Sequence, residues 1–209
     1  MLVFALPGVA ASVSIYPSAD ASVSLSDPNT NDGASQLLAT GDSFRTFMAF
    51  DVTGAVPAGS TLKSATLWVY ASGAGETPTI GIHRVTGSWS EADVTWNNQP
   101  AYDPSPVSAQ IVGPVYASGD IYSWDVTAAW PGTGTLNLAM CIEPDSTGVL
   151  SFFSREGDAV MEQYDWRPHL QVETTPVPEP ATLAVLGLGL AGLITRRGRK
   201  GYPAVSGSK

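Results

Sequence analysis

The stretch Thr61-Leu-Lys-Ser-Ala-Thr-Leu-Trp-Val-Tyr70 decides the fold class of this chain of 209 residues. Its apolar positions alternate with polar ones along most of its length, and the alternation is interrupted once near Ser64-Ala65. An alternation with a period of two residues predicts a β-strand that has one face against a core. Helical spacing is absent from this stretch.

Similar short runs lie on both sides of it, and turn-forming Gly, Pro, Asp and Ser residues separate them. The further predicted strands are residues 44–51, 79–85, 121–126, 135–142, 149–153 and 169–173. Many short strands within about 160 residues favour an all-β fold. We therefore predict a two-sheet antiparallel sandwich of the jelly-roll type over residues 12–173, followed by a single C-terminal membrane helix.

Two of these runs carry apolar side chains on both faces. In residues 44–51 phenylalanines fall on either face, and in residues 135–142 Cys141 lies opposite the leucines. Cys141 is the only cysteine of the chain, so an intramolecular disulfide is excluded. We interpret it as a small apolar residue of a strand that is buried on two sides, rather than as a reactive thiol.

The charge of the chain is unevenly distributed. Residues 12–173 contain five basic and 18 acidic residues, whereas residues 174–209 contain five basic residues and one acidic residue. An acidic body is a poor partner for nucleic acid, because contacts to phosphate require Lys and Arg. We expect no nucleic-acid partner.

Both ends of the chain have the composition of targeting segments. Residues 1–11 are apolar and end in small residues, which predicts a truncated signal peptide. At the other end, a proline-rich linker (174–180) precedes an uncharged apolar run. This pattern predicts a transmembrane helix over residues 181–195 and a basic cytoplasmic tail over residues 196–209.

The C-terminal end resembles the PEP-CTERM sorting signal. The resemblance rests on a Pro-Glu-Pro motif, a Gly-rich apolar run and a basic cluster in that order: Val177, Pro178, Glu179, Pro180, then Arg196, Arg197, Arg199 and Lys200. It implies an exosortase-type processing enzyme as a partner. It also implies export to the cell envelope or extracellular matrix, with transient anchoring of the membrane helix in the inner membrane.

The body resembles the DNRLRE family, which is close to a family of carbohydrate-binding modules known for alginate. The most specific phrases are Val85-Thr-Gly-Ser-Trp-Ser-Glu91, Val94-Thr-Trp-Asn-Asn-Gln-Pro100, Tyr122-Ser-Trp-Asp-Val-Thr127 and Phe153-Ser-Arg-Glu156. The resemblance implies a β-jelly roll that serves as a non-catalytic module. The stretch after Thr127 is shorter than in relatives.

Several aromatic and basic residues are candidates for ligand binding. Trp89 and Trp96 are predicted to plug the sandwich core, with an exposed sugar platform as the alternative. The candidate ligand-binding residues are Tyr102, Trp130, Trp166, Arg84 and Arg155. For the arginines, internal ion pairing is the favoured interpretation, with a groove for an acidic polysaccharide as the alternative.

One metal site is also a candidate. The side-chain oxygens of Asp27, Asn29 and Asn31 alternate as in a calcium loop, although the closing Glu is missing and an Asx-rich turn explains the same residues. We predict no other cofactor.

The sequence therefore predicts an exported, non-catalytic surface or matrix protein that displays a carbohydrate-binding β-sandwich. Two alternatives remain open: a structural or adhesive protein of the exopolysaccharide matrix without a defined sugar site, and, with less support, a polysaccharide-cleaving enzyme. Glu91 and Asp93 are the acidic pair that such an enzyme would use, but they are more typical of a solvated loop.

Overall fold

The stretch that decides the fold class forms a long strand, β5 (Ser60–Tyr70). Its buried side chains are Ala65, Leu67 and Val69, and the residues between them are only partly buried. The predicted break in the alternation is a β-bulge: Ser64 pairs with Glu173 and Leu62 with Thr174, so Lys63 is the extra residue. A bulge shifts the side-chain alternation by one residue, as the sequence pattern required.

The computed structural model describes residues 10–73, 76–113, 119–160 and 165–177, of which 158–160 are described by backbone alone. The other strands are β1 (Ala11–Ile15), β2 (Ala19–Ser24), β3 (Leu37–Gly41), β4 (Phe44–Asp51), β6 (Thr79–Arg84), β7 (Ser108–Ile111), β8 (Ile121–Asp125), β9 (Thr135–Ile142), β10 (Val149–Phe153) and β11 (His169–Pro176). Three short 3-10 helices lie between them: η1 (Trp96–Asn98), η2 (Thr127–Ala129) and η3 (Arg155–Val160).

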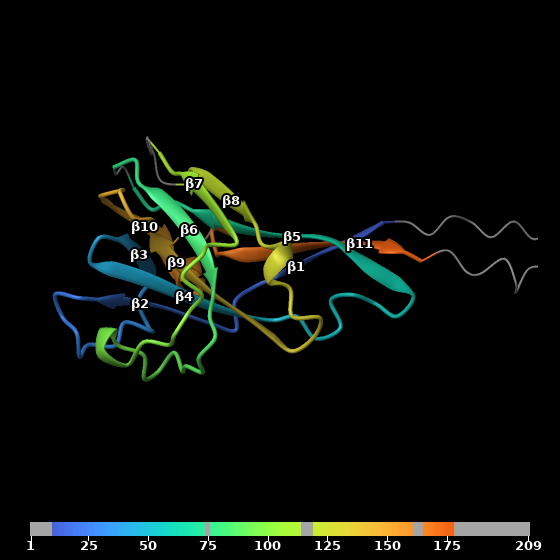
Figure 1. Cartoon of the computed structure of the whole chain (residues 1–209), viewed down its shortest axis with the longest axis horizontal. Helices are drawn as coiled ribbons and strands as arrows, with labels where there is room; N and C mark the ends of the chain where they lie inside the picture. Colours follow the sequence, from blue (N-terminus) through green and yellow to red (C-terminus); the bar gives the residue numbers. More distant parts are fainter. Residues whose placement is uncertain (1–9, 74–75, 114–118, 161–164, 178–209) are drawn as a thin grey trace, which may run out of the picture. The chain divides into compact units, whose positions relative to one another are not determined.

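The strands form two antiparallel sheets. Sheet A has the order β1-β11-β5-β8, and its first three strands lie side by side in Figure 1. Sheet B has the order β10-β3-β4-β9-β6-β7, and β2 also pairs with β4. The predicted all-β, two-sheet antiparallel sandwich is thus confirmed. Strand β11 continues to Pro176, three residues beyond the predicted end of the body.

The main core lies between the two sheets. Sheet A contributes Leu67, Trp124 and Leu170, which are fully or almost fully buried, and sheet B contributes the inward-facing residues of β4, β6 and β9. Trp124 also donates a hydrogen bond from Nε1 to the Ile80 carbonyl oxygen at 3.1 Å. Its polar atom is therefore satisfied inside the core, which buried indoles require.

A second apolar cluster covers the outer face of sheet B. Phe47 on β4 and Cys141 on β9 belong to it, as the two-sided pattern of these strands predicted. The loop formed by residues 86–107 lies over this face beside β2 and β4 (Figure 1), with Val94 buried and Trp89 and Trp96 packed against the cluster. The prediction that the two tryptophans plug the core of the sandwich is therefore wrong in place: they pack against the outer cluster of sheet B, because this face also needs a cover, and both side chains stay partly exposed.

The targeting segments fall outside the described residues. This holds for residues 1–9 of the predicted signal peptide, for Pro178–Pro180 of the sorting motif, for the predicted membrane helix (181–195) and for the basic tail (196–209). Ala11 begins β1, and Val177 directly follows β11. Among the described residues, no helix has the length and apolar composition needed to cross a membrane.

The tryptophans of the 86–107 loop should contribute measurably to stability. Trp89 packs against Phe47 with ring centroids 6.0 Å apart and donates a hydrogen bond to Asn137. Because both indoles are partly exposed, we expect Trp89→Ala and Trp96→Ala each to lower the free energy of unfolding by about 2–4 kcal/mol, toward the low end for large aromatic truncations. Denaturant unfolding measures this change.

The control is Leu25→Ala, at an apolar side chain that is 51% exposed. It should change the free energy of unfolding by no more than about 0.5 kcal/mol. Tryptophan variants as stable as this control would contradict a packing role on the outer face of sheet B and favour an exposed platform.

Candidate functional site

An aromatic group lies on the outer face of sheet A. The alternation along β5 that directs Leu67 and Val69 into the core directs Trp68 and Tyr70 to the opposite face. On the neighbouring strand, His169 is the direct partner of Trp68. Tyr16 follows the end of β1, which pairs with β11 on its other side. Antiparallel pairing thus places side chains from three strands next to one another. We call these four residues the aromatic face.

His169 is the centre of the aromatic face. Its ring centroid lies 6.3 Å from that of Tyr16, 6.4 Å from that of Trp68 and 6.1 Å from that of Tyr70. The rings of Trp68 and His169 are nearly parallel, with an interplanar angle of 11°. Tyr16 is the most accessible member, 42% exposed, and the others are partly buried.

A charged pair borders the aromatic face at Tyr16. The Tyr16 hydroxyl donates a hydrogen bond of 2.6 Å to Asp165, and the Arg167 guanidinium lies 4.1 Å from the Tyr16 ring centroid. Arg167 contacts both oxygens of Asp165 at 2.9 Å. These hydrogen bonds, with that from Arg167 the strongest influence, hold the pKa of Asp165 well below its usual range. The bond to Asp165 in turn raises the pKa of Tyr16.

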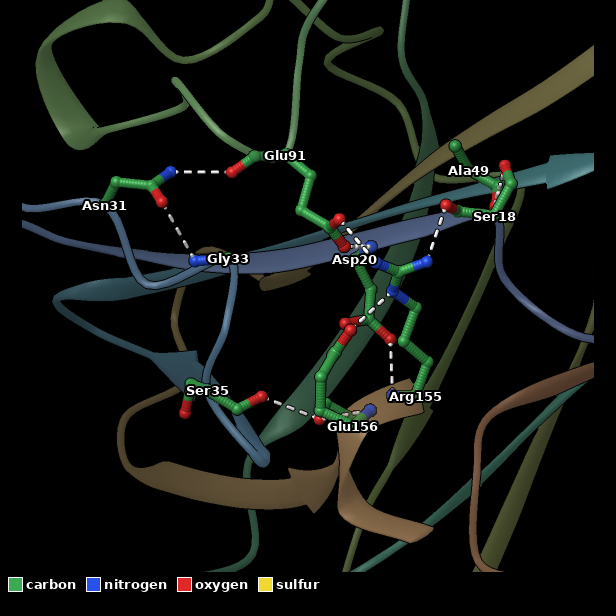
Figure 2. A network of polar contacts seen from close by, with 10 residues as sticks. Ser18, Asp20, Asn31, Gly33, Ser35, Ala49, Glu91, Arg155 and Glu156 are labelled. Carbon is green, nitrogen blue, oxygen red and sulfur yellow. Dashed lines mark hydrogen bonds and ion pairs between the residues drawn. The ribbon is translucent and has the colours of Figure 1, made fainter. Parts of the chain in front are cut away.

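A second polar site joins three segments that are distant in the sequence. Asp20 comes from β2, Glu91 from the 86–107 loop, and Arg155 and Glu156 from η3 (Figure 2). Arg155 Nη2 lies 2.6 Å from Glu91 Oε2, and Arg155 Nε lies 2.6 Å from Glu156 Oε1. The internal ion pairing predicted for Arg155 is therefore present.

We call Asp20, Glu91, Arg155 and Glu156 the acidic network. Two backbone N–H groups complete the connections among these residues. The Asp20 N–H donates to Glu91 Oε1 at 2.7 Å, and the Arg155 N–H donates to Asp20 Oδ2 at 2.9 Å. The backbone of Gly33 lies so close to that of Glu91 that a Cβ at position 33 would collide with the Glu91 carbonyl oxygen. These contacts thus join three segments: the turn at residues 27–33, the 86–107 loop and η3.

The aromatic candidates lie in different surroundings. Tyr102 packs on the outer face of sheet B beside Trp96, and its ring lies edge-on to His83 at 5.3 Å. Trp130 is partly buried against the main core. Trp166 packs against Phe153 with ring centroids 4.9 Å apart. Their binding roles stay predictions, and each ring already has a packing partner.

Of the two candidate arginines, only Arg84 lies outside the acidic network. It is exposed and donates to the Ala128 carbonyl oxygen at 2.7 Å. Ala128 also lines an open depression of roughly 550 Å³, together with Val107, Ser108, Asp125 and Thr127. No aromatic ring is among these residues, so the depression offers a ligand polar contacts and little stacking surface.

The candidate calcium residues fasten the turn at residues 27–33 to the 86–107 loop. The Asn31 amide donates to the carbonyl oxygens of Glu91 and Val94, each at 2.7 Å. Asn29 Oδ1 accepts a hydrogen bond from Asn97 at 2.9 Å. Asp27 is exposed, and its carbonyl oxygen accepts from Thr30 within the turn. Calcium binding by these three residues remains a prediction.

Sequence reasoning missed the aromatic face and most of the acidic network. The period of two along residues 61–70 contained the signal for Trp68 and Tyr70, since both fall opposite the core residues Leu67 and Val69. The proximity of Asp20 to Glu156 had no comparable signal, because 136 positions separate them and only the pairing of the sheets brings them together.

Comparison with known proteins matches the two resemblances seen in the sequence. The profile of carbohydrate-binding module family 96 matches residues 11–165, and that of the PEP-CTERM protein-sorting motif matches residues 176–200. A gellan lyase from Bacillus sp is 32% identical to this chain over 158 residues. That alignment covers 70% of the chain but 6% of the lyase, so the chain is similar to a small part of that protein.

The Asp165–Arg167 pair should make the protein more sensitive to acid. Because the pKa of Asp165 is lower in the folded protein than in the unfolded chain, the unfolded chain binds more protons below about pH 4. The pair therefore stabilises the fold above this pH, and its contribution disappears as the pH falls further. We expect Asp165→Asn to lose less stability than the wild type between about pH 5 and pH 2.5.

Urea unfolding at both pH values measures this difference. If acidification lowers the urea midpoint of the wild type and of Asp165→Asn equally, Asp165 is not the group responsible for the acid sensitivity.

Proposed function

The chain belongs to carbohydrate-binding module family 96, and from this premise we propose that its β-sandwich binds a polysaccharide through the aromatic face. The observation that carries the proposal is the gathering of Tyr16, Trp68, Tyr70 and His169 around one point of sheet A. Aromatic rings offer apolar surface to the C–H groups of a sugar ring, and the hydroxyl and imidazole groups offer hydrogen bonds to its oxygens.

The two sides of the sandwich support this choice of surface. The outer face of sheet B carries the 86–107 loop, and its aromatic rings pack against the second cluster. On sheet A, Trp68, Tyr70 and His169 alternate with core residues of β5 and β11, so the main core fixes their positions. A binding site on a rigid sheet loses little conformational entropy when the ligand binds.

The distribution of charge in the protein favours a ligand that it contacts mainly through uncharged groups. Each basic residue between positions 10 and 177 has a partner within the protein: Arg45 with Gln99, Lys63 with Glu173, Arg84 with Ala128, Arg155 with Glu91, and Arg167 with Asp165. An acidic polysaccharide would have to compete with these contacts and with the excess of acidic residues. We therefore infer stacking on sugar rings as the main source of affinity.

The family is one of binding modules, and we propose that this chain has no catalytic activity. The gellan lyase relative makes gellan a natural ligand to test, but the similarity covers only a small part of that enzyme. A structural or adhesive role without a defined sugar site is the second candidate, since the sandwich would serve it equally well. Release of reducing ends from a bound polysaccharide would support the enzymatic alternative.

The PEP-CTERM motif indicates export and association with the cell envelope. We propose in addition that an exosortase-type enzyme cuts the chain near Val177–Pro180. Residues 181–195 would hold the precursor in the membrane until then, and the released module would join the exopolysaccharide matrix. Strand β11 ends at Pro176, so a cut at this place would leave the whole sandwich intact.

Substitutions in the aromatic face should weaken binding more than folding. For a polysaccharide identified in a glycan screen that includes gellan and alginate, we expect Tyr16→Ala and Trp68→Ala each to reduce affinity about tenfold, equivalent to about 1.4 kcal/mol. Binding by the wild type should change little between about 0.05 M and 1 M salt, because stacking is not screened by ions. Affinity electrophoresis or calorimetry measures both effects.

The matched control is Leu37→Ala on sheet B, whose side chain is 42% exposed, the same fraction as that of Tyr16. It should bind as the wild type does. Variants of the aromatic face with wild-type affinity would place the site elsewhere, and a screen without any ligand would favour the structural or adhesive role.

Processing predicts a defined mature C-terminus. Mass spectrometry of the protein from its native host should find chains that end near residues 177–180 and lack the apolar run, as the order of motif, apolar run and basic cluster implies. A mature protein that retains Leu183–Leu193 would contradict cleavage at the motif.

A further inference from the structure

Three carboxylates converge at the acidic network, which shares no residue with the aromatic face. One carboxylate oxygen from each of Asp20, Glu91 and Glu156 lies within 4.8 Å of the other two. Figure 2 shows that β2, the 86–107 loop and η3 each supply one of them. Like charges at this spacing repel one another strongly unless a positive charge compensates them.

Arg155 provides only part of this compensation. Its guanidinium contacts one oxygen of Glu91 and one of Glu156, and its Nη1 donates to the Ser18 carbonyl oxygen at 2.9 Å. Asp20 receives only the backbone N–H of Arg155, at Oδ2. One positive charge thus faces three carboxylates, and the side chain of Asp20 has no direct part in the ion pairs.

Two oxygens of the network are buried without a hydrogen-bond partner. They are Asp20 Oδ1 and Glu156 Oε2, and the residue Asp20 is only 1% exposed. A buried carboxylate oxygen with no partner is costly, so such an atom in a folded protein needs a partner, which can be a proton, a water molecule or a cation. Burial also raises the pKa of Asp20 to about 7, as expected for a carboxylate that lacks its counter-charge.

We propose that Asp20, Glu91 and Glu156 bind a divalent cation of the calcium type. All three ligands are oxygens and no nitrogen or sulfur ligand takes part, which matches the preference of calcium rather than zinc. Asp20 Oδ1 and Glu156 Oε2 are the oxygens with unused lone pairs, and water completes the coordination. Two charges from the cation and one from Arg155 balance the three carboxylates.

The cation would fix the 86–107 loop on sheet B. Glu91 is the only one of the three ligands that this loop supplies, and Asp20 and Glu156 belong to segments beside it. Binding therefore couples the position of the loop, with Trp89 and Trp96, to that of β2 and η3. This site is distinct from the turn of Asp27, Asn29 and Asn31, where Asn31 contacts the Glu91 backbone through its amide.

Thermal unfolding of the full-length chain tests the proposal. After treatment with a chelator, calcium at about 1 mM should raise the melting temperature of the wild type by about 5 °C or more, because it binds the folded state alone. Asp20→Asn and Glu156→Gln should lose most of this rise. Each substitution keeps the shape of the side chain and replaces an unpartnered oxygen by a donor, so both variants should fold.

Asp27→Ala is the matched control, since it removes a carboxylate from the neighbouring turn. It should keep the full calcium response. The proposal is overturned if the wild type does not respond to calcium, if Asp20→Asn and Glu156→Gln both respond fully, or if Asp27→Ala alone loses the response. In the first case a proton shared by Asp20 and Glu156 explains the unpartnered oxygens, and in the last case the turn is the calcium site.

A direct measurement of calcium binding tests the proposal without relying on a change in stability. Equilibrium dialysis with radioactive calcium should show one ion bound per wild-type chain, and at least tenfold weaker binding to Glu156→Gln. Equal binding by the two proteins would also overturn the proposal.

Discussion

The rest of the structure depends on one constraint, which is that sheet B is apolar on both faces. Strand β4 directs Phe47 to one side and Met48 and Phe50 to the other, and all three are fully buried. Sheet A can cover only one side, so another part of the chain must remove the second side from water. The 86–107 loop performs this task, and backbone hydrogen bonds near its C-terminal end tie it to β6, from Asp103 to the Arg84 carbonyl oxygen and from Val107 to the Ile82 carbonyl oxygen.

The polar contacts of the loop are the consequence of this constraint. Arg155 binds Glu91, the Asn31 amide binds two carbonyl oxygens of the loop, and Gly33 allows the backbone to approach Glu91 closely. These contacts fix the loop at its middle, while Trp89 and Trp96 pack beneath it. Residues that resembled a family motif in the sequence therefore act together to hold the loop on the sheet that it covers.

The sequence predicted what is local and missed what depends on pairing over long distances. Seven of the eleven strands in the described residues, the bulge in β5 and the two-sided character of β4 and β9 follow from patterns that each strand carries in its own residues. Strands β1, β2, β3 and β7 were not predicted. The contact of Asp20 with Glu156 and that of Tyr16 with His169 follow from the order of strands in the sheets. Alternation does not determine that order, because an antiparallel strand fits many neighbours. The prediction for Arg155 succeeded because its partner Glu156 is adjacent in the chain.

The two sides of the sandwich consequently differ in how well they tolerate substitutions. A change in the outer residues of β4 or β9 alters the surface on which the loop packs, and so affects the tryptophans and the acidic network together. A change at Trp68 or Tyr70 leaves the core residues of β5 in place, because successive side chains of a strand point to opposite faces. If the aromatic face binds a polysaccharide, as we propose, substitutions of Trp68 and Tyr70 would change ligand preference while the main core stays in place. Under the proposed function, the aromatic face rather than the 86–107 loop would be where a sandwich of this family acquires specificity for a particular polysaccharide.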